Sequence, residues 1–187
     1  HPHHVVSPQD RPHRFVASAI YEFPFGRGRK WIRSGGWKNY VFGGWSAQGI
    51  YQGQSGPPIG FGNIIFRGNL HDIVLPRSER KVERWFNVDA GFERNSSLAL
   101  AQNIRTFPLR LTGLRADGYN NWDLSVFKTF RIKERYSAQL RVEAQDAMNH
   151  AMFSPPNSAP ANTAFGTVTG VVAPEQRRIN VVLRVNW

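Results

Sequence analysis

The last ten residues of the chain, 178–187, read RINVVLRVNW and alternate between apolar and polar side chains. Successive side chains of an extended strand point to opposite faces, so one face would carry Ile179, Val181, Leu183, Val185 and Trp187. The other face would carry Arg178, Asn180, Val182, Arg184 and Asn186. This period of two predicts a β-strand and not a helix. Two arginines on one face need water or polar partners, which a polar barrel lumen or an open solvent face supplies.

The same alternation recurs in four earlier stretches. In YSAQLRVEAQ, residues 136–145, Leu140 and Val142 alternate with Arg141 and Glu143. In NWDLSVFKTFRI, residues 121–132, Lys128 interrupts the apolar face, and we expect its long stem to snorkel to the membrane boundary. With HRFVASAIYEFPF and FGGWSAQGIYQGQSG, these runs predict strands near residues 14–24, 41–55, 121–132, 135–148 and 177–187. Each run has about 10 residues, enough for a tilted strand to cross a bilayer.

The predicted connections alternate between short and long. Residues 133–135 form a tight turn and residues 26–38 a moderate one, whereas residues 57–120 and 149–176 form long loops rich in Pro, Gly and Asn. With the C-terminus placed in the periplasm, the short connections fall inside and the long ones outside, as in bacterial barrels. Short strands are expected within the longest loop at residues 63–66 and 85–88.

The composition agrees with a membrane strand protein more than with a soluble enzyme. Six Trp and 13% aromatic residues are typical of chains with rings at a membrane interface, and the rings fall near the predicted strand ends. No cysteine is present, so neither a disulfide framework nor a thiolate metal site is available. No run of about 18 apolar residues predicts a transmembrane helix. No leader opens the sequence, so we expect any signal peptide to lie upstream of it.

Few residues suggest chemistry. His3 and His4 could bind a metal, but an exposed terminus explains them better. Glu143 and Asp146 lie near Arg141 and could form a catalytic pair, although a charge network in a lumen is the expected reading. The stretch GRGRK at residues 26–30 lacks most of a phosphate-binding loop, so it reads as a basic turn. No catalytic signature occurs, so we expect no enzymatic activity, cofactor or metal.

The last strand has a second interpretation as a sorting signal. An amphipathic strand ending on an aromatic residue can pair edge-on with the barrel-insertion machinery. Asn180, Leu183, Val185 and Trp187 fit this pattern, while Val182 occupies a position where Gly is preferred. The simpler alternative is a chain that happens to end on a strand.

Four stretches resemble the C-terminal end of Oar-like TonB-dependent receptors, which are abundant in acidobacteria and often carry a carboxypeptidase-regulatory-like domain. These stretches are DRPHRFVASAIYEFPFGRGRK, GGWSAQGIYQGQSGPPIGF, GYNNWDLSVFKTFRIKERYSAQLRVEAQDAMNH and FGTVTG with the terminal strand. Residues 146–152 depart mildly, reading DAMNHAM where the family favours a form like NALNHPQF. The resemblance implies a plugged barrel of about 22 strands that imports, or displays or exports, a substrate with energy from TonB. The plug and TonB box are expected outside this chain, and no substrate residues can be transferred.

We therefore expect an all-β fold, an antiparallel meander of five transmembrane strands forming the C-terminal part of a large outer-membrane barrel. Lipid would contact the apolar faces, and Arg141, Glu143, Arg178 and Arg184 would face the lumen. The alternative is a soluble, secreted all-β module that grips an anionic polymer with basic loops, since the net charge is +11. Nothing beyond this charge favours nucleic acid.

Overall fold

The computed structural model describes residues 5–26, 28–32, 36–98, 105–133, 136–172 and 177–187. The chain divides into two compact units. Unit 1 comprises His1–Arg14, Gln54–Tyr119 and Ala151–Ala173, and unit 2 comprises Phe15–Gly53, Asn120–His150 and Pro174–Trp187. Each unit thus combines segments that are distant in the sequence. No helix in the described ranges is long and apolar enough to cross a membrane.

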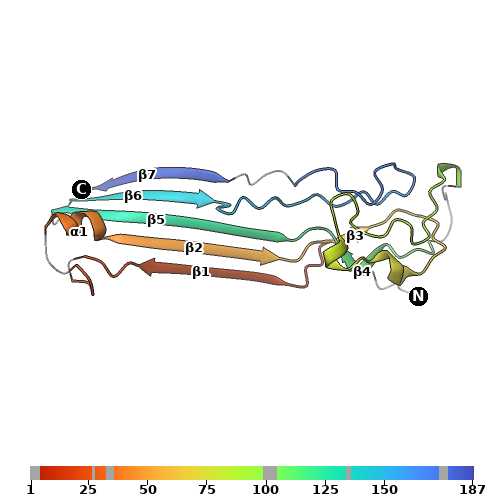
Figure 1. The fold of residues 1–187 in the computed structure, drawn as a ribbon, viewed down its shortest axis with the longest axis horizontal. Helices are drawn as coiled ribbons and strands as arrows, with labels where there is room; N and C mark the ends of the chain where they lie inside the picture. The colour runs from red at the N-terminus through yellow and green to blue at the C-terminus, as the bar shows by residue number, and fades with distance from the viewer. Residues whose placement is uncertain (1–4, 27, 33–35, 99–104, 134–135, 173–176) are drawn as a thin grey trace. The chain divides into compact units, whose positions relative to one another are not determined.

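Unit 2 is built on a five-stranded sheet in the order β1-β2-β5-β6-β7. Neighbouring strands run in opposite directions (Figure 1), so the all-β, antiparallel character predicted from the sequence is confirmed. The sheet is not closed, because β1 and β7 are its edges. Its strands are β1 (Arg14–Glu22), β2 (Trp45–Gln54), β5 (Tyr119–Lys133), β6 (Tyr136–Gln145) and β7 (Arg178–Asn186).

One predicted strand boundary is wrong. Residues 41 and 42, expected in a strand near 41–55, form the end of a short helix, α1 (Trp37–Phe42), in the connection between β1 and β2. Two glycines, Gly43 and Gly44, separate this helix from β2, and Gly44 has a φ of 74° that favours glycine. The tight turn predicted at residues 133–135 lies mostly outside the described residues, since β5 ends at Lys133.

Unit 1 is the folded form of the two long connections. A small sheet pairs β3 (Pro58–Gly60) with β4 (Arg110–Arg115), and three 3-10 helices accompany it, η1 (Leu70–Ile73), η2 (Arg77–Glu79) and η3 (Ser96–Leu98). The short strands predicted at residues 63–66 and 85–88 are not found. In their place Phe66 forms an isolated bridge with Phe92, and Trp85 donates a backbone hydrogen bond to Gly166.

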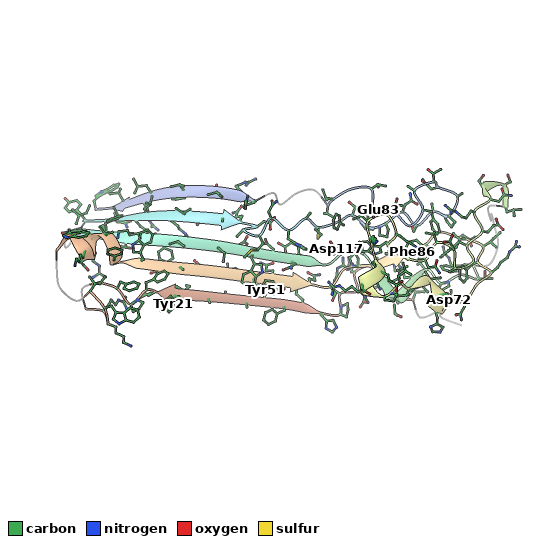
Figure 2. All side chains as sticks on the ribbon, viewed as in Figure 1. Tyr21, Tyr51, Asp72, Glu83, Phe86 and Asp117 are labelled. Atoms are coloured by element: carbon green, nitrogen blue, oxygen red, sulfur yellow. The ribbon has the colours of Figure 1, made fainter. Side chains whose placement is uncertain are left out.

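A cluster of phenylalanine rings forms the core of unit 1. Phe61 contacts Phe86 and Phe107, and Phe165 contacts Phe86 and Phe92, with ring centroids 5.0–5.7 Å apart. Figure 2 places Phe86 among the packed side chains of this unit. Every buried apolar side chain of the described residues belongs to unit 1: Ile59, Phe61, Ile64, Ile73, Phe86, Phe92, Phe107, Leu114, Ala116, Phe165 and Val168. These connections are therefore packed, unlike the open loops expected from their composition.

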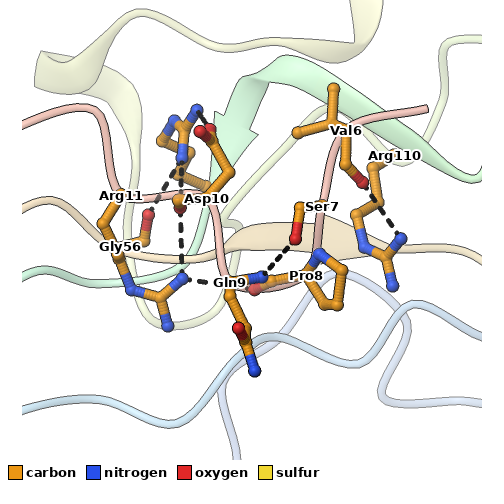
Figure 3. A network of polar contacts seen from close by, with 9 residues as sticks. Val6, Ser7, Pro8, Gln9, Asp10, Arg11, Gly56 and Arg110 are labelled. Carbon is orange, nitrogen blue, oxygen red and sulfur yellow. Dashed lines mark hydrogen bonds and ion pairs between the residues drawn. The ribbon is translucent and has the colours of Figure 1, made fainter. Parts of the chain in front are cut away.

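Backbone hydrogen bonds and arginine side chains connect the separate segments of unit 1. Arg67 donates its backbone N–H to Gly91 at 2.9 Å, and a Cβ on Gly68 would lie only 1.6 Å from the Ala90 carbonyl oxygen, so only glycine fits there. In the network of Figure 3, Arg110 donates to the Val6 carbonyl at 3.1 Å. Arg115 forms an ion pair with Asp10 and also donates to the carbonyl of Gly56. The segment before β1 is thus held within unit 1.

Burial in unit 2 is the reverse of that in unit 1. The buried polar side chains of the described residues all lie in unit 2, namely Asn121, Ser125, Lys128 and Asp146. Large apolar side chains remain exposed along the sheet, such as Tyr21, which Figure 2 labels on β1. A sheet that covers polar groups and exposes apolar ones has the pattern of a membrane barrel wall and not of a soluble core.

Candidate functional site: the two faces of the sheet

The register of β6 with β7 sorts side chains onto the two faces predicted from the alternation. Leu140 lies opposite Leu183, and Val142 lies opposite Val181. On the other face, Gln139 lies opposite Arg184, Glu143 opposite Asn180, and Gln145 opposite Arg178. Residues that pair directly in an antiparallel sheet share a face. The register therefore yields one apolar face and one polar face, continuous across both strands.

Two of the predicted lumen-facing residues form an ion pair at the centre of the polar face. The Nε of Arg141 lies 2.7 Å from a carboxylate oxygen of Glu143. The same guanidinium donates to the side-chain oxygen of Gln48 on β2 at 3.3 Å and lies 5.8 Å from the ring centre of Phe127. Since β5 separates β2 from β6, this group joins three strands. Its geometry favours a fixed, polar wall.

The other predicted polar residues lie on the edge strand. Arg178 and Arg184 are exposed and lie on the same face of the sheet as Arg141. Val182, which pairs with Arg141, lies between them on this face of β7. Asn186 donates its side-chain amide to the hydroxyl of Ser137 at 3.3 Å. The structure thus brings Arg141 and Glu143 into contact, while Arg178 and Arg184 extend the polar face at its rim.

The apolar face is exposed along β7. Leu183 is 67% exposed, Val185 is also exposed, and Trp187, which follows the strand, is 87% exposed. Of the four residues in the predicted sorting pattern, these three continue the apolar alternation, and Asn180 lies on the polar face. In water such a surface would be unfavourable, because burying one large apolar side chain stabilises a protein by about 1.5–3 kcal/mol and an exposed one lacks this stabilisation.

Aromatic rings lie at both ends of the apolar face. At one end Tyr51 contacts Phe15 and Trp122, with ring centroids 5.9 and 4.7 Å apart, across β1, β2 and β5. At the other end are Trp45 and Phe130. Trp122 and Phe130 are separated by a strand length of roughly 26 Å at the usual rise per residue. This is close to the apolar band, about 25 Å tall, that aromatic girdles flank in outer-membrane barrels.

Lys128, predicted to snorkel to the membrane boundary, lies at the end of the apolar face that carries Trp45 and Phe130 and finds its partners there. It is 5% exposed, and its Nζ donates to the carbonyl oxygens of Val41 at 2.7 Å and Gly43 at 3.1 Å. Its ammonium lies 5.0 Å from the ring centres of both Trp45 and Phe130. The last carbonyls of a helix lack partners within the helix and carry partial negative charge. Lys128 therefore fixes α1 to the apolar face of the sheet.

Replacing Lys128 by methionine is expected to release α1. The variant keeps a long apolar side chain but removes the donor that holds two helix-terminal carbonyls. Backbone amides of Trp37–Phe42 should then exchange with deuterium faster than in the wild type. Arg131→Met, which removes an exposed cation from the same strand, should leave this exchange unchanged. Equal exchange in wild type and Lys128→Met would contradict the role assigned to Lys128.

Asp123 and Asp146 accept the hydrogen bonds that form the turn after β6. The sequence did not predict this turn. Asp123 accepts hydrogen bonds from the side-chain amide of Asn121 at 3.1 Å and from the backbone N–H of Asp146 at 3.0 Å. Asp146 in turn accepts from the backbone N–H of His150 at 3.1 Å. Both Asp146 and Asn149 have positive φ, which Asp and Asn tolerate best among non-glycine residues. Asp146 therefore shapes a turn, and Glu143 is engaged separately with Arg141.

The remaining sequence candidates do not assemble into a reactive site. His3, His4 and Arg27 lie outside the described residues, and Arg29 of the basic turn pairs with Glu22. Within the described ranges, no three metal-ligating side chains gather. Unit 1 contains a cavity of about 280 Å³ lined by Ile64, Glu93, Leu98 and Pro160 among others. Elsewhere in unit 1, burial and then the neighbouring Arg77 lower the pKa of Arg80, which stays cationic at neutral pH.

Comparison with known proteins identifies the family. A model of the outer membrane beta barrel domain matches residues 2–180, which include all of β1 to β6 and the start of β7. No curated protein and no solved structure matches the chain. The family points to the bacterial outer membrane, in agreement with the exposed apolar face and the aromatic rings at its two ends. The chain belongs to the outer membrane beta barrel domain family.

Proposed function

We propose that the chain is the C-terminal part of the barrel of a TonB-dependent receptor, which binds a substrate outside the cell and transports it across the outer membrane. The observation that carries the barrel assignment is the burial in unit 2, where the buried side chains of the described residues are polar and many large apolar ones are exposed. The resemblance to Oar-like receptors supports the finer assignment. The proposed role is transport without catalysis.

The two faces suit the two surroundings of a barrel wall. The apolar face, which carries Val181, Leu183 and Val185 on β7, would contact lipid. The polar face, with the Arg141–Glu143 pair and Gln48 fixed against each other, would line the lumen. An ordered row of charges provides a hydrated path along which polar substrates can exchange water for protein hydrogen bonds. Arg178 and Arg184 would extend this lining towards the next strand of the complete barrel.

The packed unit 1 suits a receptor role. It is formed by the long connections, which the strand order assigns to the extracellular side if the C-terminus is periplasmic. Its phenylalanine core gives those connections a defined surface, and preorganised loops bind with a smaller entropic cost than mobile ones. Substrate recognition outside the cell is therefore the function we assign to unit 1.

The C-terminal strand is proposed as the contact with the barrel-insertion machinery. β7 is an edge of the sheet, so one side of its backbone is available for pairing, and its apolar face ends at the exposed Trp187. TonB itself would contact a plug region elsewhere in the complete protein. The secreted binding module is not favoured, because such a module would have to leave the apolar face of unit 2 in water.

The proposal is tested with the complete receptor in its own cells. A receptor deletion and a TonB deletion should lose uptake of the same nutrients, and the double deletion should be no worse than either. Complementation with a receptor lacking only the TonB box should restore a folded barrel in the outer membrane but not uptake. Full uptake through that variant would contradict TonB-dependent transport while leaving the barrel assignment in place.

A further inference from the structure

The short helix α1 exposes nearly all of its apolar side chains. Trp37 is 68% exposed and Tyr40 is 66% exposed, and Val41 and Phe42 are exposed as well. Only Asn39 of its six residues is half-buried. Helices this short are unstable in isolation and normally form because an apolar side is buried against the protein. In α1 these apolar side chains are instead exposed, so the helix presents an apolar surface that a partner can cover.

The sheet holds α1 through its backbone. The Val41 carbonyl accepts hydrogen bonds from Lys128 Nζ at 2.7 Å and from the indole N–H of Trp45 at 2.9 Å. Lys128 and Trp45 belong to the apolar face, since Lys128 lies between Val126 and Phe130 in the alternation of β5. The helix therefore lies over the face that would contact lipid. The exposed rings of Trp37 and Tyr40 remain available to a partner.

An aromatic turn adjoins the helix. The ring of Phe25 lies 6.4 Å from that of Phe23 and 5.3 Å from that of Trp31, and Lys30 lies 5.7 Å from the centre of the Trp31 ring. Buried glycines allow the turn and the helix to meet, since a Cβ on Gly26 would lie 2.9 Å from the Cα of Gly43. Lys38 is exposed on α1 itself. The combined surface is aromatic with basic groups at its margin.

We propose that α1 and this aromatic turn form a binding surface for anionic phospholipid at the membrane interface. Trp and Tyr rings are favoured at the headgroup level, where one part of the ring is apolar and another is hydrated. Lys38 would pair with the phosphodiester of the headgroup, and the neighbouring rings would lie against the upper acyl chains. The inference rests on the proposed membrane-spanning function and adds a site for a particular lipid class.

Position and charge both favour lipid over a protein partner. α1 lies in a connection on the end of the sheet that also holds the end of β7 and the chain terminus (Figure 1), which the barrel assignment places at the periplasmic leaflet. The surface adjoins the apolar face at Trp45, whose indole N–H donates to the Val41 carbonyl. Its exposed lysines, Lys30 and Lys38, have the sign that an anionic headgroup requires.

The test uses the complete protein, first shown to be inserted in vesicles by protection of its strands from protease. In vesicles of phosphatidylcholine brominated at shallow acyl positions, the tryptophan fluorescence should be quenched. Trp37→Phe should remove part of that quenching, whereas Trp85→Phe, the same change in unit 1, should not. Equal quenching in the wild type and Trp37→Phe would overturn the proposal and would favour a protein partner for α1.

The lipid class is tested in vesicles with equal amounts of phosphatidylcholine and phosphatidylglycerol. Native mass spectrometry of the released protein should find phosphatidylglycerol enriched, and Lys38→Gln should lower this enrichment about fivefold. Lys81→Gln, an equivalent loss of an exposed lysine in unit 1, should not change it. Enrichment that is absent, or equally reduced by both variants, would overturn the proposed headgroup contact. A protein that fails to insert at all would instead contradict the proposed barrel function, and with it the site.

Discussion

Replacing Leu183 by arginine is expected to destabilise the inserted barrel by about 2–4 kcal/mol if Leu183 lies near the bilayer midplane. Leu183 is 67% exposed on the apolar face of β7 and pairs with Leu140 on β6. A guanidinium at this position would have to leave water without gaining a charged partner, since its neighbours on that face are aliphatic. The loss is measured by reversible unfolding of the complete barrel from vesicles.

Asn180→Arg is the matched control for this prediction. It introduces the same side chain into the same strand but on the polar face, where Asn180 lies opposite Glu143. We expect an effect below about 1 kcal/mol, as for other polar-face changes with a nearby opposite charge. Equal destabilisation by the two arginines would show that β7 does not separate lipid from a polar lumen.

Phe86→Ala is expected to destabilise unit 1 by about 3–5 kcal/mol, the usual cost of removing a buried aromatic side chain. Phe86 is 0% exposed, and its ring contacts those of Phe61 and Phe165. A cavity at this position would weaken the packing between segments distant in the sequence, which also meet through backbone hydrogen bonds such as that from Trp85 to Gly166. Hydrogen exchange of the amides of Ile73 and Leu114, both fully buried, measures the free energy of opening of the unit.

Leu98→Ala is the control for Phe86→Ala, because Leu98 belongs to the same unit but is exposed. It should leave the exchange of Ile73 and Leu114 nearly unchanged. Phe86→Ala should also leave the strands of unit 2 inserted and protected, since Phe86 belongs to the core of unit 1. Unchanged exchange in Phe86→Ala would mean that the phenylalanine cluster does not stabilise the long connections.

The faces of the sheet could be predicted from the sequence because they depend on local alternation. In β6 and β7 each residue's face follows from its position in a period of two, and the observed register pairs Val142 with Val181 and Glu143 with Asn180. The ion-pair partner of Arg141 could also be predicted, since Glu143 is two residues away on the same strand and therefore on the same face. Alternation says nothing about how many further strands complete the barrel.

Lys128 and α1 could not be predicted, because their contact joins residues far apart in the sequence. A lysine in an apolar row has two ways to avoid lipid, by reaching the boundary or by finding acceptors nearby. Its acceptors, the carbonyls of Val41 and Gly43, become available only because residues 37–42 form a helix. The sequence WKNYVF has few strong helix formers, so propensity gives little indication of that helix.

The core of unit 1 was missed for a related reason. Its rings, such as Phe61, Phe86 and Phe165, follow neither a period of two nor a helical period, and Gly and Pro between them suggest open loops. Packing arises when residues 57–119 meet residues 151–173, which only the three-dimensional arrangement reveals. The abundance of phenylalanine in a predicted loop was the one signal available, since large rings rarely remain in water without a partner.

The central claim, that the sheet separates lipid from a polar lumen, is tested most directly by cysteine scanning along β7. Single cysteines at positions 179–185 of the complete protein in vesicles would carry a spin label, with accessibility to oxygen and to a water-soluble relaxation agent measured at each. A barrel wall should give alternation with a period of two: positions 179, 181, 183 and 185 accessible to oxygen, and positions 180, 182 and 184 accessible to the aqueous agent. Equal aqueous accessibility at all seven positions would contradict the barrel assignment.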